Sequence, residues 1–365
     1  MAMDWFRGMM LVFALIVCGA RPVGGVELRV GGWLVPWDVE GGRRDALLNP
    51  NMFGEVSLFM ARLGADGLPR LDKAFAREAA AGWSGLRSGL TISRLWLTVV
   101  NDVETESGVL LKDRATVVRV LSEADLRAAH IEKLVELARM PGVIGIELDY
   151  EGLQLVDAHL YAQFVEALGG RLHAISRSLA VVVPAKSEAG RDGYIWSRLA
   201  RASDVVRVMA YEEHGTWSGP GPVATLGFLR RVAEYALGEI PGDRCCIALG
   251  AYGFDWPAGG GGGVLDRTYA QAQTAAAREG ATIQRTPGDD NPWYRYRDNS
   301  GGSRVVWFED AQSLGQKVRM LSGLGIRNFY IWRMGGLPPR LESSLLEGSR
   351  KVPREEISGR RGSAS

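Results

Sequence analysis

Short apolar runs alternate with longer amphipathic segments along most of this chain, and this alternation restricts the fold more than any other feature. Segments such as 122–140 and 158–178 repeat apolar residues with the helical period. Eight shorter runs have the length and composition of strands, at 28–35, 55–60, 94–100, 143–150, 179–184, 204–211, 245–252 and 328–333. Strands that alternate with helices predict a parallel α/β sheet, and eight such units predict a closed (β/α)8 TIM barrel. A doubly wound open sheet is the competing architecture.

The connection between the seventh and eighth runs departs from this rhythm. It contains a glycine run, the helical stretch "TYAQAQTAAAREG" and the aromatic, polar piece "NPWYRYRDNSGG". These features predict a small α+β insertion at 253–305 that would wall one side of a cleft. The barrel as a whole is expected to span 26–345.

The two ends of the sequence differ from the segment between them. Residues 1–25 hold an apolar run followed by small residues, which is typical of a secretory signal peptide. The run is short for a membrane span, so we expect a secreted or periplasmic protein without a stable span after signal removal. A buried N-terminal helix is the alternative, and Cys18 leaves lipoprotein anchoring as another. Residues 346–365 are polar and without period, which predicts a disordered tail.

Composition excludes several classes of function. The 365 residues are 46% hydrophobic, enough for a full core, and 43 Lys and Arg balance 42 Asp and Glu. No long basic run is present, so no nucleic-acid partner is expected. The four His are scattered and the adjacent Cys245 and Cys246 are interpreted as core residues. The sequence therefore predicts no metal site, no disulfide framework and no cofactor.

The strand "VIGIELDYEGL" places carboxylates at every second position: Glu147, Asp149 and Glu151. Because side chains alternate between the faces of a strand, the three acids share one face and the apolar residues between them share the other. In a barrel the acids would point inward toward the C-terminal mouth, where active sites lie. Crowded like charges raise at least one pKa, which allows proton donation near neutral pH. No matching basic residue lies nearby in the sequence, although an ion-pair network, a wet edge strand or a cation site are alternatives.

Several segments together resemble one enzyme family. "IGIELDYEG" looks like the D-x-x-D-x-D-x-E signature on the fourth strand of glycoside hydrolase family 18, the chitinase-like (β/α)8 enzymes. "VVRVMAYEEH", "IALGAYGFDW" and "YIWRMGG" resemble the sixth, seventh and eighth strands of that family, in the same order. "VWFEDAQSLGQKV" is similar to the branch that includes spore-cortex and peptidoglycan N-acetylglucosaminidases.

The resemblance implies a role for each matching residue. Glu151 corresponds to the catalytic acid/base, and Asp149 to the carboxylate that orients and polarises the acetamido group of the substrate. Tyr211 matches the tyrosine that hydrogen-bonds the same acetamide, Met209 lines that pocket, and Trp332 matches the floor under the sugar that is cleaved.

Three positions depart from the family pattern. Ile144 stands where the first Asp of the signature belongs, Glu147 replaces the middle Asp, and Glu212 replaces the Asp that follows the tyrosine. In the family, the residue matching Asp149 shares a proton with an acid beneath it. Glu147 and Glu212 are therefore expected in supporting roles, with Glu147 able to continue the relay and Ile144 unable to.

Tryptophans in predicted loops add candidate sugar-binding surfaces, because pyranose faces stack on flat rings. Trp37, Trp217, Trp256 and Trp293 follow strands or lie in the insertion, and simple packing is the alternative for each.

The resemblance implies an exported, retaining hydrolase of N-acetylglucosamine-containing glycans, either peptidoglycan or chitin-like. Its mechanism is substrate-assisted: the N-acetyl group of the substrate attacks the anomeric carbon. The alternatives are a carbohydrate-binding protein that has lost turnover and a transglycosylating or structural wall protein.

Overall fold

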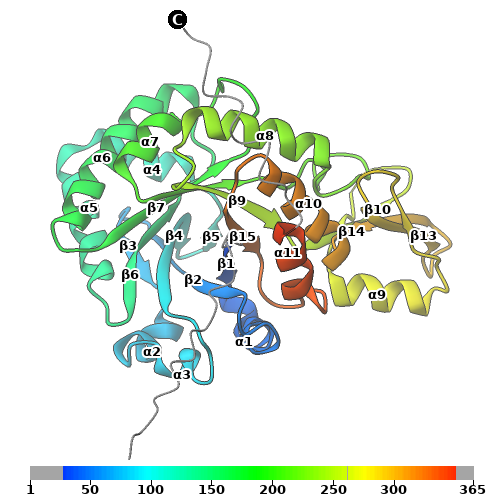
Figure 1. Cartoon of the computed structure of the whole chain (residues 1–365). Coiled ribbons are helices and arrows are strands. Elements are labelled where there is room, and N and C mark those ends of the chain that lie inside the picture. The colour runs from blue at the N-terminus through cyan, green and yellow to red at the C-terminus, as the bar shows by residue number, and fades with distance from the viewer. Residues whose placement is uncertain (1–27, 261, 351–365) are drawn as a thin grey trace, which may run out of the picture.

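The computed structural model describes residues 28–260 and 262–350, and Figure 1 traces their path. The predicted signal peptide, Cys18 and positions 351–365 of the predicted tail lie outside these residues. The first part of that tail is helical, because α11 spans Leu341–Arg350 and packs on α10 (Ala311–Gly323). The boundary predicted at 345 is therefore too early. Within the described ranges, no helix combines the length and apolarity of a membrane span.

Eight parallel strands of the described chain close a barrel, which confirms the predicted fold over an open sheet. Closure results because β1 pairs with both β2 and β15, while β2 also pairs with β4. In order around the barrel the strands are β1 Arg29–Leu34, β2 Phe53–Gly64, β4 Arg94–Thr105, β6 Val143–Asp149, β7 Ser178–Pro184, β8 Val205–Met209, β9 Cys245–Gly250 and β15 Asn328–Trp332.

Two strands run well past their predicted ends. β2 and β4 leave the barrel rim and form antiparallel hairpins with β3 Pro69–Leu71 and β5 Gly108–Leu110. The sequence prediction stopped at the end of each apolar run, because the hairpin residues are more polar. The β4–β5 hairpin matters for function, since the loop that follows it borders the cleft described below.

Helices cover the outside of the barrel, as Figure 1 shows. The longer helices are α1 Val39–Leu48, α4 Arg114–Ser122, α5 Ala124–Ala138, α6 Ala158–His173, α7 Trp196–Ala202, α8 Leu226–Glu239 and α10 Ala311–Gly323. Short helical turns are η1 Pro36–Asp38, η2 Lys73–Phe75, α2 Ala76–Ala80, α3 Ser84–Arg87 and η3 Leu155–Asp157. Side-chain caps fix the first residues of several helices. Asp113 caps α4 by accepting a hydrogen bond from the Thr116 amide at 2.8 Å, and Thr225 caps α8 by accepting one from the Phe228 amide at 3.1 Å.

The segment predicted as an insertion forms a second sheet beside the barrel, drawn in yellow to orange in Figure 1. Its five described strands pair antiparallel, and its helix is α9 Tyr269–Arg278. Tyr294, Val306 and Phe308 form a small core of its own with the alanines of α9. The strands are β10 Tyr252–Pro257, β11 Leu265–Thr268, β12 Gln284–Arg285, β13 Pro292–Arg297 and β14 Ser303–Phe308.

Strand β6 divides its side chains between the two faces as the sequence predicts. Ile146, Leu148 and Tyr150 are buried against the outer helices, and the Tyr150 ring stacks on Phe164 of α6 at 6.4 Å. Glu147 and Asp149 belong to the opposite face, which is the barrel interior. The strand therefore presents its acids to the axis of the barrel.

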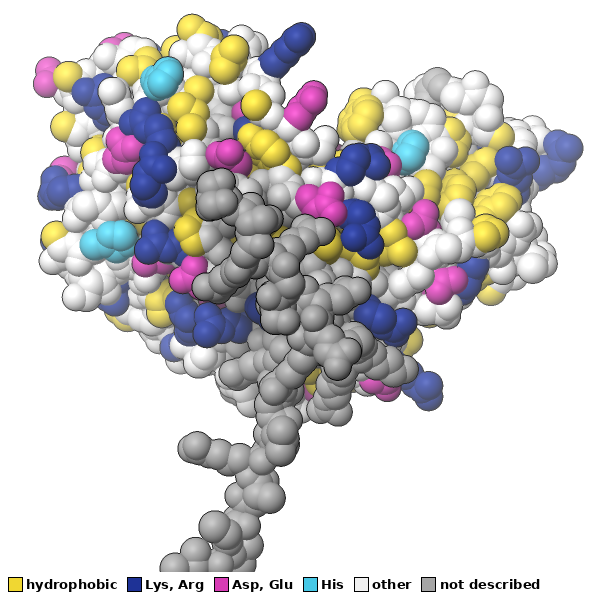
Figure 2. All heavy atoms as spheres, turned by 45° about the horizontal axis from the view of Figure 1, so that its top comes forward, with side chains coloured by type: hydrophobic (Ala, Val, Ile, Leu, Met, Phe, Trp, Pro, Cys, Tyr) yellow, Lys and Arg dark blue, Asp and Glu magenta, His cyan; other side chains and the backbone are white. Residues whose placement is uncertain are grey.

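Surface charge follows the near-neutral composition. Figure 2 shows Lys and Arg side chains interspersed with Asp and Glu over the face turned toward the viewer.

Candidate active site

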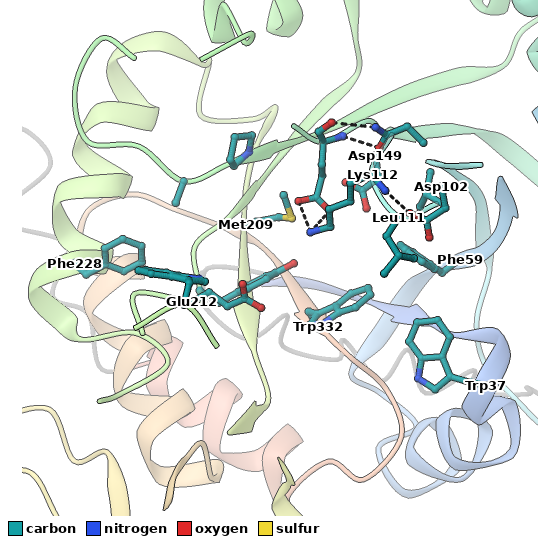
Figure 3. A pocket seen from close by; sticks show the side chains of 17 residues that line it. Trp37, Phe59, Asp102, Leu111, Lys112, Asp149, Met209, Glu212, Phe228 and Trp332 are labelled. Atoms are coloured by element: carbon teal, nitrogen blue, oxygen red, sulfur yellow. Dashed lines mark hydrogen bonds and ion pairs between the residues drawn. The ribbon is translucent and has the colours of Figure 1, made fainter. Parts of the chain in front are cut away.

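A cleft of about 560 Å³ opens at the C-terminal ends of the barrel strands, the end at which barrel enzymes place their active sites. Figure 3 shows Asp149 and Lys112 on one side of it and Trp332 across from them. Acidic and aromatic side chains dominate its lining. The acidic and aromatic ones are Trp37, Phe59, Asp102, Asp149, Glu151, Tyr211, Glu212, Trp217, Phe228 and Trp332, and Lys112 and Met209 also line the cleft.

Asp149 and Glu151 reach the cleft from the end of β6 and the turn after it. Asp149 is 6% exposed, whereas the Glu151 side chain is 24% exposed. Asn101, near the end of β4, holds the backbone of Glu151 through two hydrogen bonds: the Asn101 amide donates to the Glu151 carbonyl at 3.0 Å, and the Glu151 N–H donates back at 2.9 Å. This clamp fixes where the Glu151 side chain begins.

Lys112 pairs directly with Glu151. Its ammonium nitrogen lies 2.8 Å from each of the two carboxylate oxygens. Lys112 follows the β4–β5 hairpin with a left-handed backbone (φ 51°), and its N–H donates to Asp102 at 2.8 Å. Sequence reasoning missed both Asn101 and Lys112. Asn101 carries a signal, as a polar residue at the end of an apolar run, whereas Lys112 carries none.

Burial and the neighbouring charge of Glu151 raise the pKa of Asp149 well above its ordinary value, with Lys112 opposing part of this rise. One Asp149 oxygen is buried without a hydrogen-bond partner in the described structure. A protonated carboxyl aimed into the cleft fits both observations. The raised pKa predicted for this carboxylate face therefore belongs to Asp149.

Met209, Tyr211 and Glu212 come from the end of β8 and the loop after it. All three line the cleft with Asp149 and Glu151. Burial raises the pKa of Tyr211 far above its ordinary value, so its hydroxyl stays protonated and able to donate a hydrogen bond. Glu212 adopts a left-handed backbone (φ 58°) and accepts a hydrogen bond from the Tyr252 hydroxyl at 3.0 Å.

Trp332, the last residue of β15, forms an aromatic wall of the cleft. Its ring contacts Phe59 at 5.3 Å and Trp33 at 5.7 Å, both edge-on, which leaves the indole supported from within the barrel. Trp37 and Trp217 also line the cleft and are 61% and 67% exposed. These three tryptophans therefore offer flat surfaces to a ligand.

The family-model comparison agrees with this geometry. Residues 114–336 match the model of glycosyl hydrolases family 18, which is more than half of the chain. The chain belongs to glycosyl hydrolases family 18. The match includes every strand from β6 to β15 and therefore the positions of Asp149, Glu151, Tyr211 and Trp332.

Curated relatives of this chain include proteins of Bacillus species. The chain is 28% identical over 221 residues to a putative sporulation-specific glycosylase, YdhD, of Bacillus subtilis, covering 59% of this chain and 53% of the relative. It is also 28% identical over 224 residues to the cortical fragment-lytic enzyme of the same organism, covering 59% and 52%. The chain thus spans about half the length of these curated relatives.

Two solved structures share the fold of this chain. The spore cortex-lytic enzyme SleL of Bacillus cereus superposes with a TM-score of 0.77 at 19% identity, over 91% of this chain and 76% of that one. A chitinase from Chromobacterium violaceum gives 0.76 at 23% identity, over 88% and 98%.

The family departure at Glu147 has a structural explanation. Glu147 is fully buried in the barrel and ion-paired with the buried guanidinium of Arg207 from β8. It also accepts hydrogen bonds from Trp33 at 2.6 Å, Thr98 at 2.7 Å and Ser57 at 3.1 Å. None of the hydrogen bonds of Glu147 in the described structure reaches Asp149. The expected relay through Glu147 gains no support from this geometry.

A second expectation, that no basic residue pairs with the carboxylates, is wrong. The sequence showed no basic residue near the carboxylates, yet Arg207 and Lys112 both pair with them. Arg207 also binds Glu55 at 2.8 Å and lies 4.0 Å over the Tyr330 ring. Its partner lies 60 positions earlier in the chain, on a strand that is not adjacent in the sheet, so local sequence gives no hint of the pair.

Two further tryptophans lie away from the cleft, and so does Ile144, which agrees with its exclusion from the relay. Trp256 is 1% exposed, packs on Phe254 and donates to the Gly215 carbonyl at 3.2 Å, so its predicted contact with substrate is wrong. Trp293 stacks on Trp307 at 5.4 Å within the insertion sheet and is absent from the cleft lining. Ile144 lies half-buried at the opposite end of β6 from the cleft.

Groups of acidic, His and Cys side chains that could hold a metal ion are not found among the described residues. The carboxylates around β6 are instead paired with basic side chains: Lys112 pairs with Glu151, and the buried Arg207 pairs with Glu147.

Proposed function

We propose that this protein is an exported glycosidase that hydrolyses β-linked glycans containing N-acetylglucosamine, of the peptidoglycan or chitin type. The observation that carries the proposal is the convergence of Asp149, Glu151, Tyr211 and Trp332 from three strands in one cleft. Family membership supports a glycan as substrate, and the cortex-lytic and chitinase names of its relatives support these two glycan types.

Glu151 would supply the proton. It is the more exposed of the two cleft carboxyls and would protonate the oxygen of the leaving sugar, then activate water in the second step. No enzyme nucleophile is needed, because the carbonyl oxygen of the 2-acetamido group attacks its own anomeric carbon and gives retention.

Asp149 and Tyr211 would hold the acetamido group in the attacking geometry. A protonated or shared-proton Asp149 can bond the acetamide nitrogen or oxygen, and the Tyr211 hydroxyl, which stays protonated, can donate to the carbonyl oxygen. Orientation of this kind contributes on the order of 7 kcal/mol or more in intramolecular reactions. Trp332 would lie beneath the sugar ring, and Met209 beside the acetyl methyl.

Export is part of the proposal because its substrates lie outside the cytoplasm. The signal-like composition of residues 1–25 supports it. Expression of the full chain with cell fractionation and N-terminal sequencing tests it: a mature protein that begins after residue 25 in a non-cytoplasmic fraction is expected.

Incubation with chitin oligomers and purified wall glycan fragments, read by mass spectrometry, tests the activity. Wild type is expected to release smaller saccharides, and Glu151→Gln to lose about 10²–10⁴-fold in rate. Glu136→Gln, on the exposed surface of α5, is the matched control and should keep full activity. Failure of wild type to cleave any of these glycans would overturn the proposal.

Glycan binding without turnover is a second candidate. The observation that favours it is that Lys112 contacts both oxygens of Glu151, so that neither oxygen is free to meet the leaving group. In that case wild type and Glu151→Gln would bind the oligomers equally in calorimetry, and neither would release product.

A further inference from the structure

The ion pair between Lys112 and Glu151 conflicts with the work expected of Glu151. A general acid must carry a proton and reach the leaving oxygen within hydrogen-bond distance. With the ammonium 2.8 Å from both oxygens, both oxygens of Glu151 are engaged and neither can reach a leaving oxygen. The pair must therefore open before the first step of the reaction.

Opening the pair leaves Lys112 without its partner. Lys112 is the single basic side chain among the described residues that line the cleft, and it is 60% exposed. The charges that face it are Glu151, Asp149 and Glu212, with Asp102 on its own backbone N–H. Of these, only Glu151 is close enough to form a direct ion pair with its side chain in the described structure.

The position of Lys112 limits which part of a substrate could replace Glu151. Lys112 comes from the loop after the β4–β5 hairpin, whereas Tyr211 follows β8 and Trp332 ends β15, two strands that are not neighbours of β4 in the barrel. The acetamido sugar is expected over Trp332, so the neighbouring sugar would extend past Glu151 toward Lys112. A carboxylate on that neighbouring sugar could take the ammonium from Glu151 in a charge-assisted hydrogen bond.

We infer that Lys112 is a specificity-determining residue that selects acetamido glycans bearing a carboxylate on the sugar next to the cleaved bond. The carboxylate draws Lys112 away, and Glu151 then takes up a proton from solvent and acts as the acid. A neutral chitin oligomer offers no such group and must break the pair without compensation. This inference rests on the proposed function and narrows its substrate class.

Two glycans of equal length test the inference. One is an alternating wall glycan whose lactyl side groups carry free carboxylates, and the other is the same glycan with those carboxylates converted to amides. Wild type is expected to show a kcat/KM about tenfold or more higher on the carboxylate form, the size of one charge-assisted hydrogen bond.

The variants assign that preference to Lys112. In Lys112→Met the ratio of the two kcat/KM values should fall to about one, whereas Lys112→Arg should keep a clear preference because it retains the charge. Lys133→Met, which removes an exposed ammonium on α5, should leave the ratio as in wild type. Each variant is assayed at a temperature where its circular dichroism matches wild type.

Two results would overturn the inference while leaving the proposed function intact: wild type cleaves both glycans with equal kcat/KM, or Lys112→Met keeps the full wild-type ratio. Failure of wild type to cleave either glycan would overturn the proposed function and this inference with it.

Discussion

Strand β6 and the turn after it carry two acidic regions of opposite character within five residues. The lower carboxylate, Glu147, is fully buried and receives hydrogen bonds from Trp33, Ser57 and Thr98 as well as the guanidinium of Arg207. The upper pair, Asp149 and Glu151, has one buried oxygen without a partner and one carboxylate held by a solvent-exposed lysine. A saturated buried carboxylate serves the fold, whereas an under-satisfied one at the mouth is available for chemistry.

Removing the charge that neutralises the lower carboxylate should give the largest effect. Arg207→Met leaves Glu147 and Glu55 buried or half-buried without their shared cation, so unfolding free energy should fall by about 3–5 kcal/mol. Urea unfolding monitored by tryptophan fluorescence measures the loss. The double variant Arg207→Met with Glu147→Gln should recover part of it, and no recovery would show that the ion pair is not the cause.

Asp149→Asn should separate activity from stability in the upper pair. Activity should fall about 100-fold, the range for loss of one proton-handling group. Because the folded protein holds the Asp149 proton more tightly than the unfolded chain, its stability falls as pH rises from about 4 through the raised pKa. Asn cannot ionise, so the variant should be more stable than wild type at pH 7.

Thermal unfolding at two pH values checks that sign. The difference in Tm between Asp149→Asn and wild type should be small at pH 4 and larger, in favour of the variant, at pH 7. A variant that is less stable at both values would contradict the raised pKa.

Two touching tryptophans sharpen the same comparison, since Trp33 belongs to the lower region and Trp332 to the upper. Trp33→Phe removes a donor to buried Glu147 and should cost about 1–3 kcal/mol of stability. Trp332→Leu should instead lower kcat/KM about tenfold through the lost sugar platform. Denaturation curves and steady-state kinetics on both variants measure the two effects. If Trp33→Phe mainly lowered activity and Trp332→Leu mainly lowered stability, the assignment of the lower region to the fold and the upper region to chemistry would be refuted.

The smallest effect is expected at the rim. Trp217 is 67% exposed in the loop after β8, so Trp217→Ala should leave stability within about 0.5 kcal/mol of wild type. It should raise KM for long oligomers a few-fold and leave that for short ones unchanged. Equal KM changes for both lengths would place Trp217 elsewhere in the binding path.

The fold was predictable because each barrel strand is an apolar run with its own local signal. The inward face of β6 was predictable for the same reason, since alternation alone puts Glu147 and Asp149 on one side. Arg207 and Lys112 were not, because each pairs with an acid far away in sequence, and only barrel closure and the β4–β5 hairpin bring them together. Trp256 was wrongly predicted to bind substrate, because a tryptophan just after a predicted strand was assigned to a loop. In the structure it belongs to β10 and is buried.

The most direct test of the proposed chemistry is the configuration of the first product. Proton NMR spectra taken during the first minutes of glycan hydrolysis, before mutarotation, distinguish the two anomers of the new reducing end. Attack by the acetamido group followed by water predicts the β anomer from a β-linked glycan. Initial release of the α anomer would contradict the account of Asp149, Tyr211 and Glu151.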